Sequence, residues 1–148
     1  CGYTVIPKKL QINGININRM WERRQNTKFN GASYIAQRGA SAIFSKLGQK
    51  DIIDNIGYYK ENALIISKAL NDVGIKFIGG ENSPYIWLTC PEKVNSWKFF
   101  EILLNEMSIV GTPGIGFGKN GEGYMRLTAF GRREDVLEAA DRLRKYYS

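Results

Sequence analysis

The strongest candidate for chemistry is an arginine in the middle of residues 121–130, which read Gly-Glu-Gly-Tyr-Met-Arg-Leu-Thr-Ala-Phe. Two sets of side chains alternate along this segment: Tyr124, Arg126 and Thr128 against Met125, Leu127 and Ala129. Alternation with a period of two predicts a strand with one apolar face. A guanidinium held on a strand offers a planar fork of donors that matches a carboxylate. We therefore expect Arg126 to lie at the edge of a binding site, with a surface ion pair or a cation–π contact as the alternative.

The glycine-rich residues 111–123, just before this strand, do not fit a nucleotide-binding loop. A dinucleotide fingerprint needs glycine where Lys119 stands and a helix directly afterwards. A Walker loop needs glycine at Pro113 and serine or threonine at Asn120. We expect a flexible connection between two strands instead, with closure over a bound substrate as the functional alternative.

Histidine is absent from the chain, and this removes several classes of site. Ser-His-Asp and Cys-His nucleophiles, histidine bases and histidine metal ligands are all excluded. The two cysteines, Cys1 and Cys90, form no Cys-x-x-Cys pair, so we expect no metal site and a cytoplasmic, reducing compartment. A membrane-spanning helix needs about 20 apolar residues in a row, and no such run exists.

Positive charge is concentrated in the first third of the chain. The net charge is +7 in total, with +8 on residues 1–50 and −1 on residues 51–148. A basic region suits nucleic acid, a phosphorylated ligand or an acidic protein surface, which can belong to a missing part of the same protein. No recognised nucleic-acid module accompanies the charge, so a nucleic-acid partner is not expected. A non-enzymatic module that binds RNA or acidic protein through residues 8–28 is the competing class.

Hydrophobic periodicity predicts one long helix followed by alternating strands and helices. The predicted strands are residues 3–6, 76–78, 85–90, 108–111 and the strand of Arg126. The predicted helices are residues 15–24, 32–47, 51–73, 97–106 and 132–147, with residues 10–14 as a loop. Asn30 or Ser33 could cap the second of these helices, and Gly48 and Gly74 would end the second and third. This order indicates an α/β fold, or an α+β lobe with a small sheet.

Six segments occur in a fixed order along the chain: Cys-Gly-Tyr-Thr-Val-Ile-Pro-Lys-Lys-Leu, Thr-Lys-Phe-Asn-Gly-Ala-Ser-Tyr-Ile, Tyr-Tyr-Lys-Glu-Asn-Ala, Pro-Tyr-Ile-Trp-Leu, Gly-Thr-Pro-Gly-x-Gly-Phe-Gly and Gly-Glu-Gly-Tyr-x-Arg-Leu-Thr-Ala-Phe-Gly. Together they resemble the C-terminal part of the LL-diaminopimelate aminotransferases, which are pyridoxal-phosphate enzymes of the fold type I aminotransferases. The similarity covers essentially all 148 residues. The second and last segments are the most specific to this family.

The resemblance implies roles for two residues and an organisation into two domains. Arg126 falls on the arginine that binds the substrate α-carboxylate, and Asn30 on an asparagine that reaches the neighbouring subunit's site near cofactor and substrate. Residues 1–49 would be a remnant of the large cofactor-binding domain. Residues 50–148 would be the linking helix and the small C-terminal substrate-binding domain. The functional unit implied is a homodimer that uses pyridoxal 5′-phosphate.

The same resemblance implies that essential groups lie outside this chain. The family's Schiff-base lysine, a phosphate-contacting arginine and the aspartate that partners the pyridine nitrogen have no counterpart here, and the lysine is expected just upstream of Cys1. The chain also lacks an initiator methionine, so we interpret it as a fragment that is inactive alone. The implied activity of the intact enzyme is amino transfer between LL-diaminopimelate and 2-oxoglutarate in lysine biosynthesis. Another fold type I aminotransferase, acting on aspartate or an aromatic amino acid, is the alternative.

Overall fold

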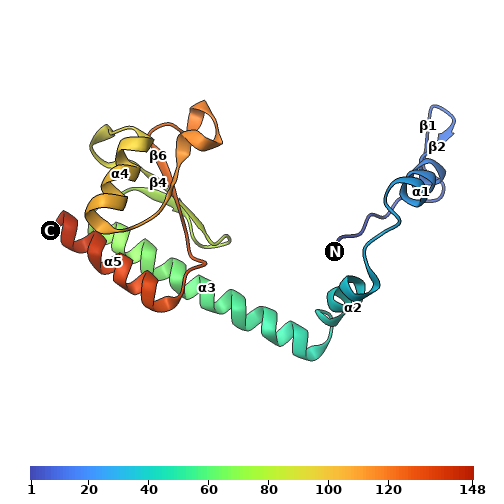
Figure 1. Ribbon diagram of the computed structural model, residues 1–148, viewed down its shortest axis with the longest axis horizontal. Helices are drawn as coiled ribbons and strands as arrows, with labels where there is room; N and C mark the ends of the chain where they lie inside the picture. The colour runs from blue at the N-terminus through green and yellow to red at the C-terminus, as the bar shows by residue number, and fades with distance from the viewer. The chain divides into compact units, whose positions relative to one another are not determined.

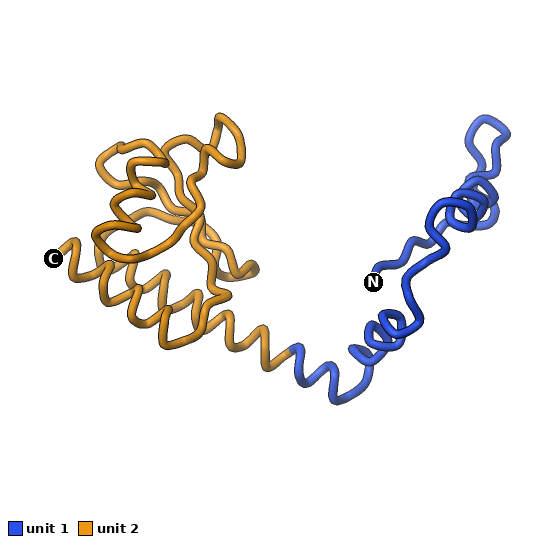
Figure 2. Tube along the Cα trace, viewed as in Figure 1, with its two compact units in different colours: residues 1–52 blue, residues 53–148 orange.

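The computed structural model describes all 148 residues. Its contacts divide the chain into two compact units, residues 1–52 and residues 53–148 (Figures 1 and 2). The boundary lies within the longest helix, α3, which spans Lys46–Asp72. Unit 1 and unit 2 below refer to these two parts.

Unit 1 begins with a small hairpin. Strand β1 (Gln11–Ile12) pairs antiparallel with β2 (Ile15–Asn16). The two strands are joined by Asn13 and Gly14, which have φ angles of 52° and 76°. An Asn-Gly pair is the preferred sequence for a tight hairpin, because both residues tolerate positive φ. The predicted loop at residues 10–14 is therefore wrong in part, since its ends pair as strands.

Two short helices follow, and each starts at a side-chain cap. Helix α1 (Ile17–Lys28) is capped by Asn16, whose side chain accepts a hydrogen bond from the backbone N–H of Arg19. Helix α2 (Tyr34–Ala42) is capped by Ser33. Such caps satisfy N–H groups that have no partner within the first turn of a helix.

The boundaries in unit 1 differ from the predicted ones. Residues 3–6 form no strand, because no other segment offers them a ladder of hydrogen bonds. The helix predicted for residues 32–47 stops at Ala42, and Gly48 lies inside α3 instead of ending a helix. Ser45 explains this, because its hydroxyl accepts a hydrogen bond from the backbone N–H of Gly48 at 3.0 Å and so opens a new helix.

Unit 2 contains a four-stranded antiparallel sheet. Its strands are β3 (Phe77–Gly79), β4 (Tyr85–Thr89), β5 (Thr112–Pro113) and β6 (Tyr124–Thr128). Their order across the sheet is β3-β4-β6-β5, so β6 lies in the interior of the sheet between β4 and β5.

Three helices cover one face of this sheet: the C-terminal part of α3, α4 (Ser96–Met107) and α5 (Arg133–Tyr147) (Figure 1). The core between the helices and the sheet is formed by Ala63, Ala69, Leu70, Ile75, Ile86, Leu88, Cys90, Phe99, Leu103, Met107, Met125, Ala129, Ala140 and Leu143. This arrangement confirms the prediction of an α+β lobe with a small sheet. It also leaves the second face of the sheet without a covering helix.

The structure corrects one predicted strand in unit 2 and gives the conformation of the connection that follows it. No strand forms at residues 108–111, because Ser108 ends α4 in the left-handed conformation (φ 53°) and the chain pairs only from Thr112, where β5 begins. The connection predicted to be flexible contains two 3₁₀ helices, Gly114–Phe117 and Lys119–Gly121. A third, Pro91–Lys93, links β4 to α4.

Candidate functional site

Arg126 lies at the centre of the uncovered face of the sheet. Met125 and Ala129, its neighbours in the alternating pattern, are fully buried against the helices, as the sequence predicts. Arg126 therefore points to the opposite face, where it stands directly across from Trp87 of β4 and Thr112 of β5. Its side chain is partly buried.

Two aromatic rings hold the guanidinium of Arg126. The Cζ atom lies 4.5 Å from the centre of the Tyr85 ring and 4.7 Å from the centre of the Phe117 ring. The Nε atom is buried and has no hydrogen-bond partner. The Phe117 ring in turn packs edge-on against Trp87 at 5.6 Å. The cation–π contact considered from sequence is thus present, and it comes from two rings.

Arg126 differs from every other arginine of unit 2 in lacking a carboxylate partner. The ion pairs of the other four are Arg132–Asp135, Arg133–Glu61, Arg142–Glu138, Arg144–Asp72 and Arg144–Asp141. A cation that is partly desolvated and unpaired is costly, so such groups are usually matched by an anion. The terminal nitrogens of Arg126 can bind a carboxylate in the bidentate manner typical of arginine.

The loop that carries Phe117 is anchored to the start of α4. The Glu122 carboxylate accepts hydrogen bonds from the backbone N–H of Ser96 at 2.7 Å, from the Ser96 hydroxyl at 3.0 Å and from the N–H of Gly123 at 3.0 Å. These donors, the Ser96 N–H foremost, lower the pKa of Glu122 below its usual value. Because Ser96 and Glu122 are far apart in sequence, no local pattern signals this contact.

A close approach of two glycines holds the same loop together. A Cβ atom on Gly114 would lie 2.2 Å from the carbonyl oxygen of Gly121, and one on Gly121 would lie 2.0 Å from that of Gly114. Both distances are far below van der Waals contact, so only glycine fits at either position. The glycines of this loop therefore permit a close fold of the backbone, which holds Phe117 against the guanidinium.

Asn30 belongs to unit 1 and follows α1 with a φ of 61°. Asparagine tolerates this left-handed conformation better than most residues. Its backbone N–H donates to the carbonyl of Gln25, and its exposed side-chain amide makes no hydrogen bond within the chain. Since Ser33 caps α2, the capping role considered for Asn30 is not used, and its amide keeps a donor and an acceptor for a ligand.

Neither the buried cysteine nor the metal-ligating side chains form a second site. Burial, with a smaller effect of the Glu122 charge, raises the pKa of Cys90 to about 11, so this thiol is not a nucleophile at neutral pH. No group of three or more histidine, cysteine, aspartate or glutamate residues could hold a metal ion. None of the helices combines the length and apolar character that crossing a bilayer requires.

Comparison with known proteins agrees with this architecture. The family model of class I and II aminotransferases matches residues 1–143. The chain therefore belongs to the class I and II aminotransferase family.

Individual relatives show which aminotransferases of this family the chain is similar to. The chain is 54% identical to the LL-diaminopimelate aminotransferase of Parabacteroides distasonis and 56% identical to that of Phocaeicola vulgatus, over 99% of its own length. It spans only 37% of the length of either relative. These matches confirm the resemblance derived from the six sequence segments.

Solved structures give the same result. The L,L-diaminopimelate aminotransferase of Chlamydomonas reinhardtii matches with a TM-score of 0.87 and 41% identity, covering 97% of this chain and 36% of that protein. An aromatic aminotransferase from Pyrococcus horikoshii matches with a TM-score of 0.75 and 26% identity, covering 88% of this chain and 35% of that protein. The similarity to the first is closer in both sequence and structure.

Proposed function

We propose that this chain is the C-terminal part of an aminotransferase that moves an amino group between LL-diaminopimelate and 2-oxoglutarate, a step of lysine biosynthesis in the cytoplasm. The identity to relatives of that name, over 99% of the chain, supports the choice of substrate class. The 37% share of those relatives supports the view that other segments complete the enzyme. Residues 1–49 would belong to the large domain, and residues 50–148 to the linking helix and the small domain.

The central observation is the unpaired guanidinium of Arg126. This side chain is held by two rings and faces no carboxylate of its own chain. In the proposed function it binds the α-carboxylate of the amino-acid substrate in the first half-reaction. In the second half-reaction it binds the corresponding carboxylate of 2-oxoglutarate. Such a contact orients the substrate so that its α-carbon meets the reacting groups in a fixed geometry.

Pyridoxal 5′-phosphate would supply the electron sink for the chemistry at the α-carbon. Asn30 fits a place beside this cofactor, because its exposed amide is free to donate and to accept a hydrogen bond. We propose that it does so in the site of the partner subunit of a homodimer. The chain by itself, without the lysine that the reaction requires, would be inactive.

Replacement of Arg126 tests the assignment. In the intact enzyme, Arg126→Lys should lose the bidentate contact and lower kcat/KM for the amino donor by a factor equivalent to roughly 2–4 kcal/mol. Arg132→Lys is the matched control, since the Arg132 side chain is 78% exposed and pairs only with Asp135. Unchanged catalytic efficiency of the Arg126 variant would remove this residue from the site.

Kinetic measurements on the same enzyme distinguish LL-diaminopimelate from the amino donors of the alternative aminotransferases. Relative kcat/KM values for LL-diaminopimelate, aspartate and phenylalanine, each with 2-oxoglutarate, should rank LL-diaminopimelate first. A preference for phenylalanine would favour the aromatic aminotransferases, one of which shares this fold at 26% identity. The 148-residue chain mixed with pyridoxal phosphate should show neither amino transfer nor the absorbance of a cofactor bound to lysine.

A further inference from the structure

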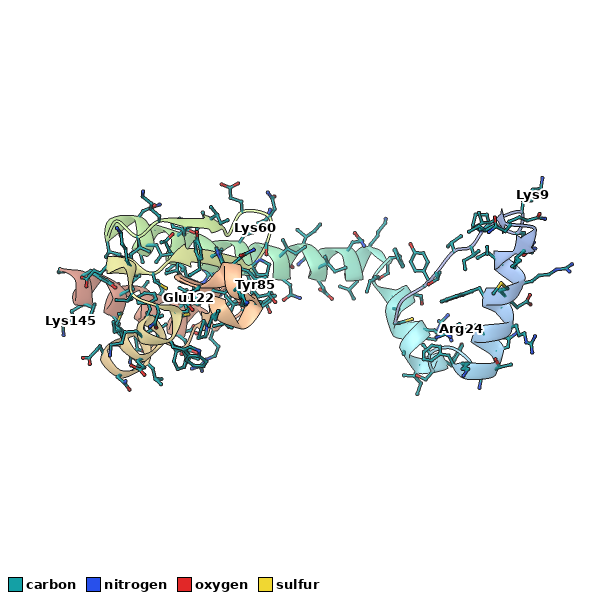
Figure 3. The ribbon with its side chains drawn as sticks, turned by 90° about the horizontal axis from the view of Figure 1, so that it is seen from above. Lys9, Arg24, Lys60, Tyr85, Glu122 and Lys145 are labelled. Atoms are coloured by element: carbon teal, nitrogen blue, oxygen red, sulfur yellow. The ribbon has the colours of Figure 1, made fainter.

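The manner in which Arg126 is held carries an inference beyond its contact with substrate. We propose that Tyr85 and Phe117 are positioning residues, whose rings clamp the guanidinium of Arg126 and fix the direction in which its terminal nitrogens meet the carboxylate. This inference rests on the proposed role of Arg126. Tyr85, labelled in Figure 3, comes from strand β4, and Phe117 comes from the anchored glycine-rich loop.

Aromatic rings suit this task because they orient a cation without neutralising it. A carboxylate that held Arg126 would compete with the carboxylate of the substrate for the same donors. The negative face of an aromatic ring attracts a guanidinium but leaves its N–H groups available for a ligand. The contrast within unit 2 is direct: Arg133 stacks on the Tyr58 ring and also pairs with Glu61, whereas Arg126 has rings alone.

The buried Nε atom indicates which end of the guanidinium is offered. Carboxylates bind arginine either through the two terminal nitrogens or from the side, through Nε and one terminal nitrogen. In Arg126 the Nε atom is buried without a partner, so the side approach is closed. The end-on approach remains, in which both carboxylate oxygens meet the terminal nitrogens.

Each ring of the clamp is supported from a different part of unit 2. Tyr85 packs edge-on against Phe130 at 5.9 Å, and Phe130 packs against Tyr59 of α3 at 4.9 Å. Phe117 packs against Trp87 at 5.6 Å. Since the two rings have separate supports, replacing one should loosen the guanidinium without removing the other ring.

A first experiment observes the clamp directly in the 148-residue chain. Nitrogen-15 NMR of the arginine Nε–H groups should show the Arg126 proton shifted upfield by the two rings and slow to exchange with solvent, because it is buried. Phe117→Leu and Tyr85→Leu should each move this signal downfield and speed its exchange at least several-fold. Tyr146→Leu is the control, since Tyr146 is 44% exposed, close to the 41% of Tyr85, and also packs edge-on against a ring. An Arg126 signal that neither variant changes would overturn the clamp.

A second experiment measures the consequence in the intact enzyme. Phe117→Leu and Tyr85→Leu should each raise KM for the amino donor roughly 2- to 10-fold, the range expected for a cation–π contact whose rings are partly exposed, with a smaller change in kcat. Phe117→Tyr and Tyr85→Phe keep a ring and should restore most of the loss, which a general defect in folding would not predict.

The outcomes separate the clamp from the function on which it rests. If Arg126→Lys lowers kcat/KM while both leucine variants keep the KM of the parent enzyme, the clamp is refuted and the carboxylate site stands. If Arg126→Lys has no effect on kcat/KM, the proposed contact of Arg126 with the substrate carboxylate is refuted, and the role of the clamp in substrate binding is refuted with it. A rise in KM for both leucine variants, reversed by the ring-keeping variants, supports the clamp.

Discussion

Two arginines of unit 2 stack on tyrosine rings, yet their surroundings assign them opposite roles. The Arg133 side chain donates from Nε to the buried side chain of Asn62 and from a terminal nitrogen to the carbonyl of Tyr58, and it pairs with Glu61 at 2.7 Å. Asn62 in turn donates to the carbonyls of Ala129 and Gly131. Arg133 therefore links α3 to α5. The Arg126 side chain, in contrast, donates no hydrogen bond to another group of the chain and pairs with no carboxylate.

This difference predicts that replacing Arg133 costs more stability than replacing Arg126. Arg126→Met should leave the free energy of unfolding of the chain within about 1 kcal/mol of the parent, because it removes a partly buried charge without a partner. Arg133→Met should destabilise by roughly 1–3 kcal/mol, because the side-chain oxygen of buried Asn62 loses its donor. Urea unfolding followed by far-UV circular dichroism compares the two. A larger loss for Arg126→Met than for Arg133→Met would contradict the assignment.

The position of Arg126 on a half-buried strand could be predicted from sequence, because the relevant signal is local. Its strand alternates over a few residues, and the structure buries Met125 and Ala129 as that alternation requires. The partners of Asn62 could not be predicted in this way, since they lie 67 to 71 residues away in sequence. The contacts of Arg126 with the two rings could not be predicted either, because Tyr85 belongs to another strand and the fold of the loop that carries Phe117 depends on the close approach of Gly114 to Gly121.

At the scale of elements, the glycine-rich loop is closed by two glycines that lie in close contact, and replacing one of them should destabilise the chain. Gly114→Ala would place a Cβ atom 2.2 Å from the carbonyl oxygen of Gly121, so backbone must move. We expect a loss of roughly 1–3 kcal/mol in the free energy of unfolding, as for other overpacked sites. Gly116→Ala is the matched control, because a Cβ atom there meets nothing within 4 Å and Gly116 does not have positive φ. Equal stability of the two variants would show that the loop is not closed as described.

The contact between Glu122 and α4 predicts a dependence on pH. Hydrogen bonds from the Ser96 and Gly123 backbone lower the pKa of Glu122 from its usual 4.5 in the folded chain. A lowered folded-state pKa means that the carboxylate stabilises the fold above its unfolded pKa, and that this stabilisation is lost as pH falls through the folded pKa.

Thermal unfolding of the parent and of Glu122→Gln tests this dependence. The melting temperature of the parent should exceed that of the variant at about pH 6, and the difference should shrink as pH is lowered to about 3. The other carboxylates are common to both proteins, so the difference isolates Glu122. A gap that stays constant over this range would show that ionisation of Glu122 does not contribute.

The predicted elements were most accurate where a single helix or strand carries its own signal. Helix α4 starts one residue before its predicted boundary at residue 97, and the Asn95 side chain caps it by accepting a hydrogen bond from the N–H of Lys98. The boundary between α2 and α3 was wrong, because Gly48 was interpreted as a terminator although Ser45 caps the helix that contains it. Within α3, Ala63 and Leu70 are buried, while Ile56, earlier in the helix, is 50% exposed.

On the scale of the whole molecule, the two units differ in whether they have a core. Unit 2 buries a continuous cluster between its sheet and its helices. In unit 1 no residue is buried, and large apolar side chains are exposed: Tyr3, Val5, Phe29, Tyr34, Ile35, Phe44 and Leu47 among them. Lys9 and Arg24, labelled in Figure 3, belong to the excess of positive charge in the same region. Apolar surface of this extent is typical of a segment that packs against other protein.

A segment without buried side chains has little to offset the conformational entropy of an ordered backbone, which costs roughly 1–2 kcal/mol per residue. In the 148-residue chain, amide hydrogens of unit 1 should therefore exchange within about tenfold of the rate of an unfolded peptide. Those of β4, β6 and α5 should be protected by the global stability of unit 2. Hydrogen exchange with mass spectrometry measures both parts at once.

The intact enzyme supplies the decisive comparison. If the remaining segments of the protein cover unit 1, its amide hydrogens should become as protected there as those of unit 2. Helix α1, which is capped but has no buried residue, is the most informative reporter, because a cap alone contributes only about 1 kcal/mol. Strong protection of α1 in the 148-residue chain would mean that unit 1 is stable by itself, and its exposed apolar residues would then require a different explanation from packing within a larger aminotransferase.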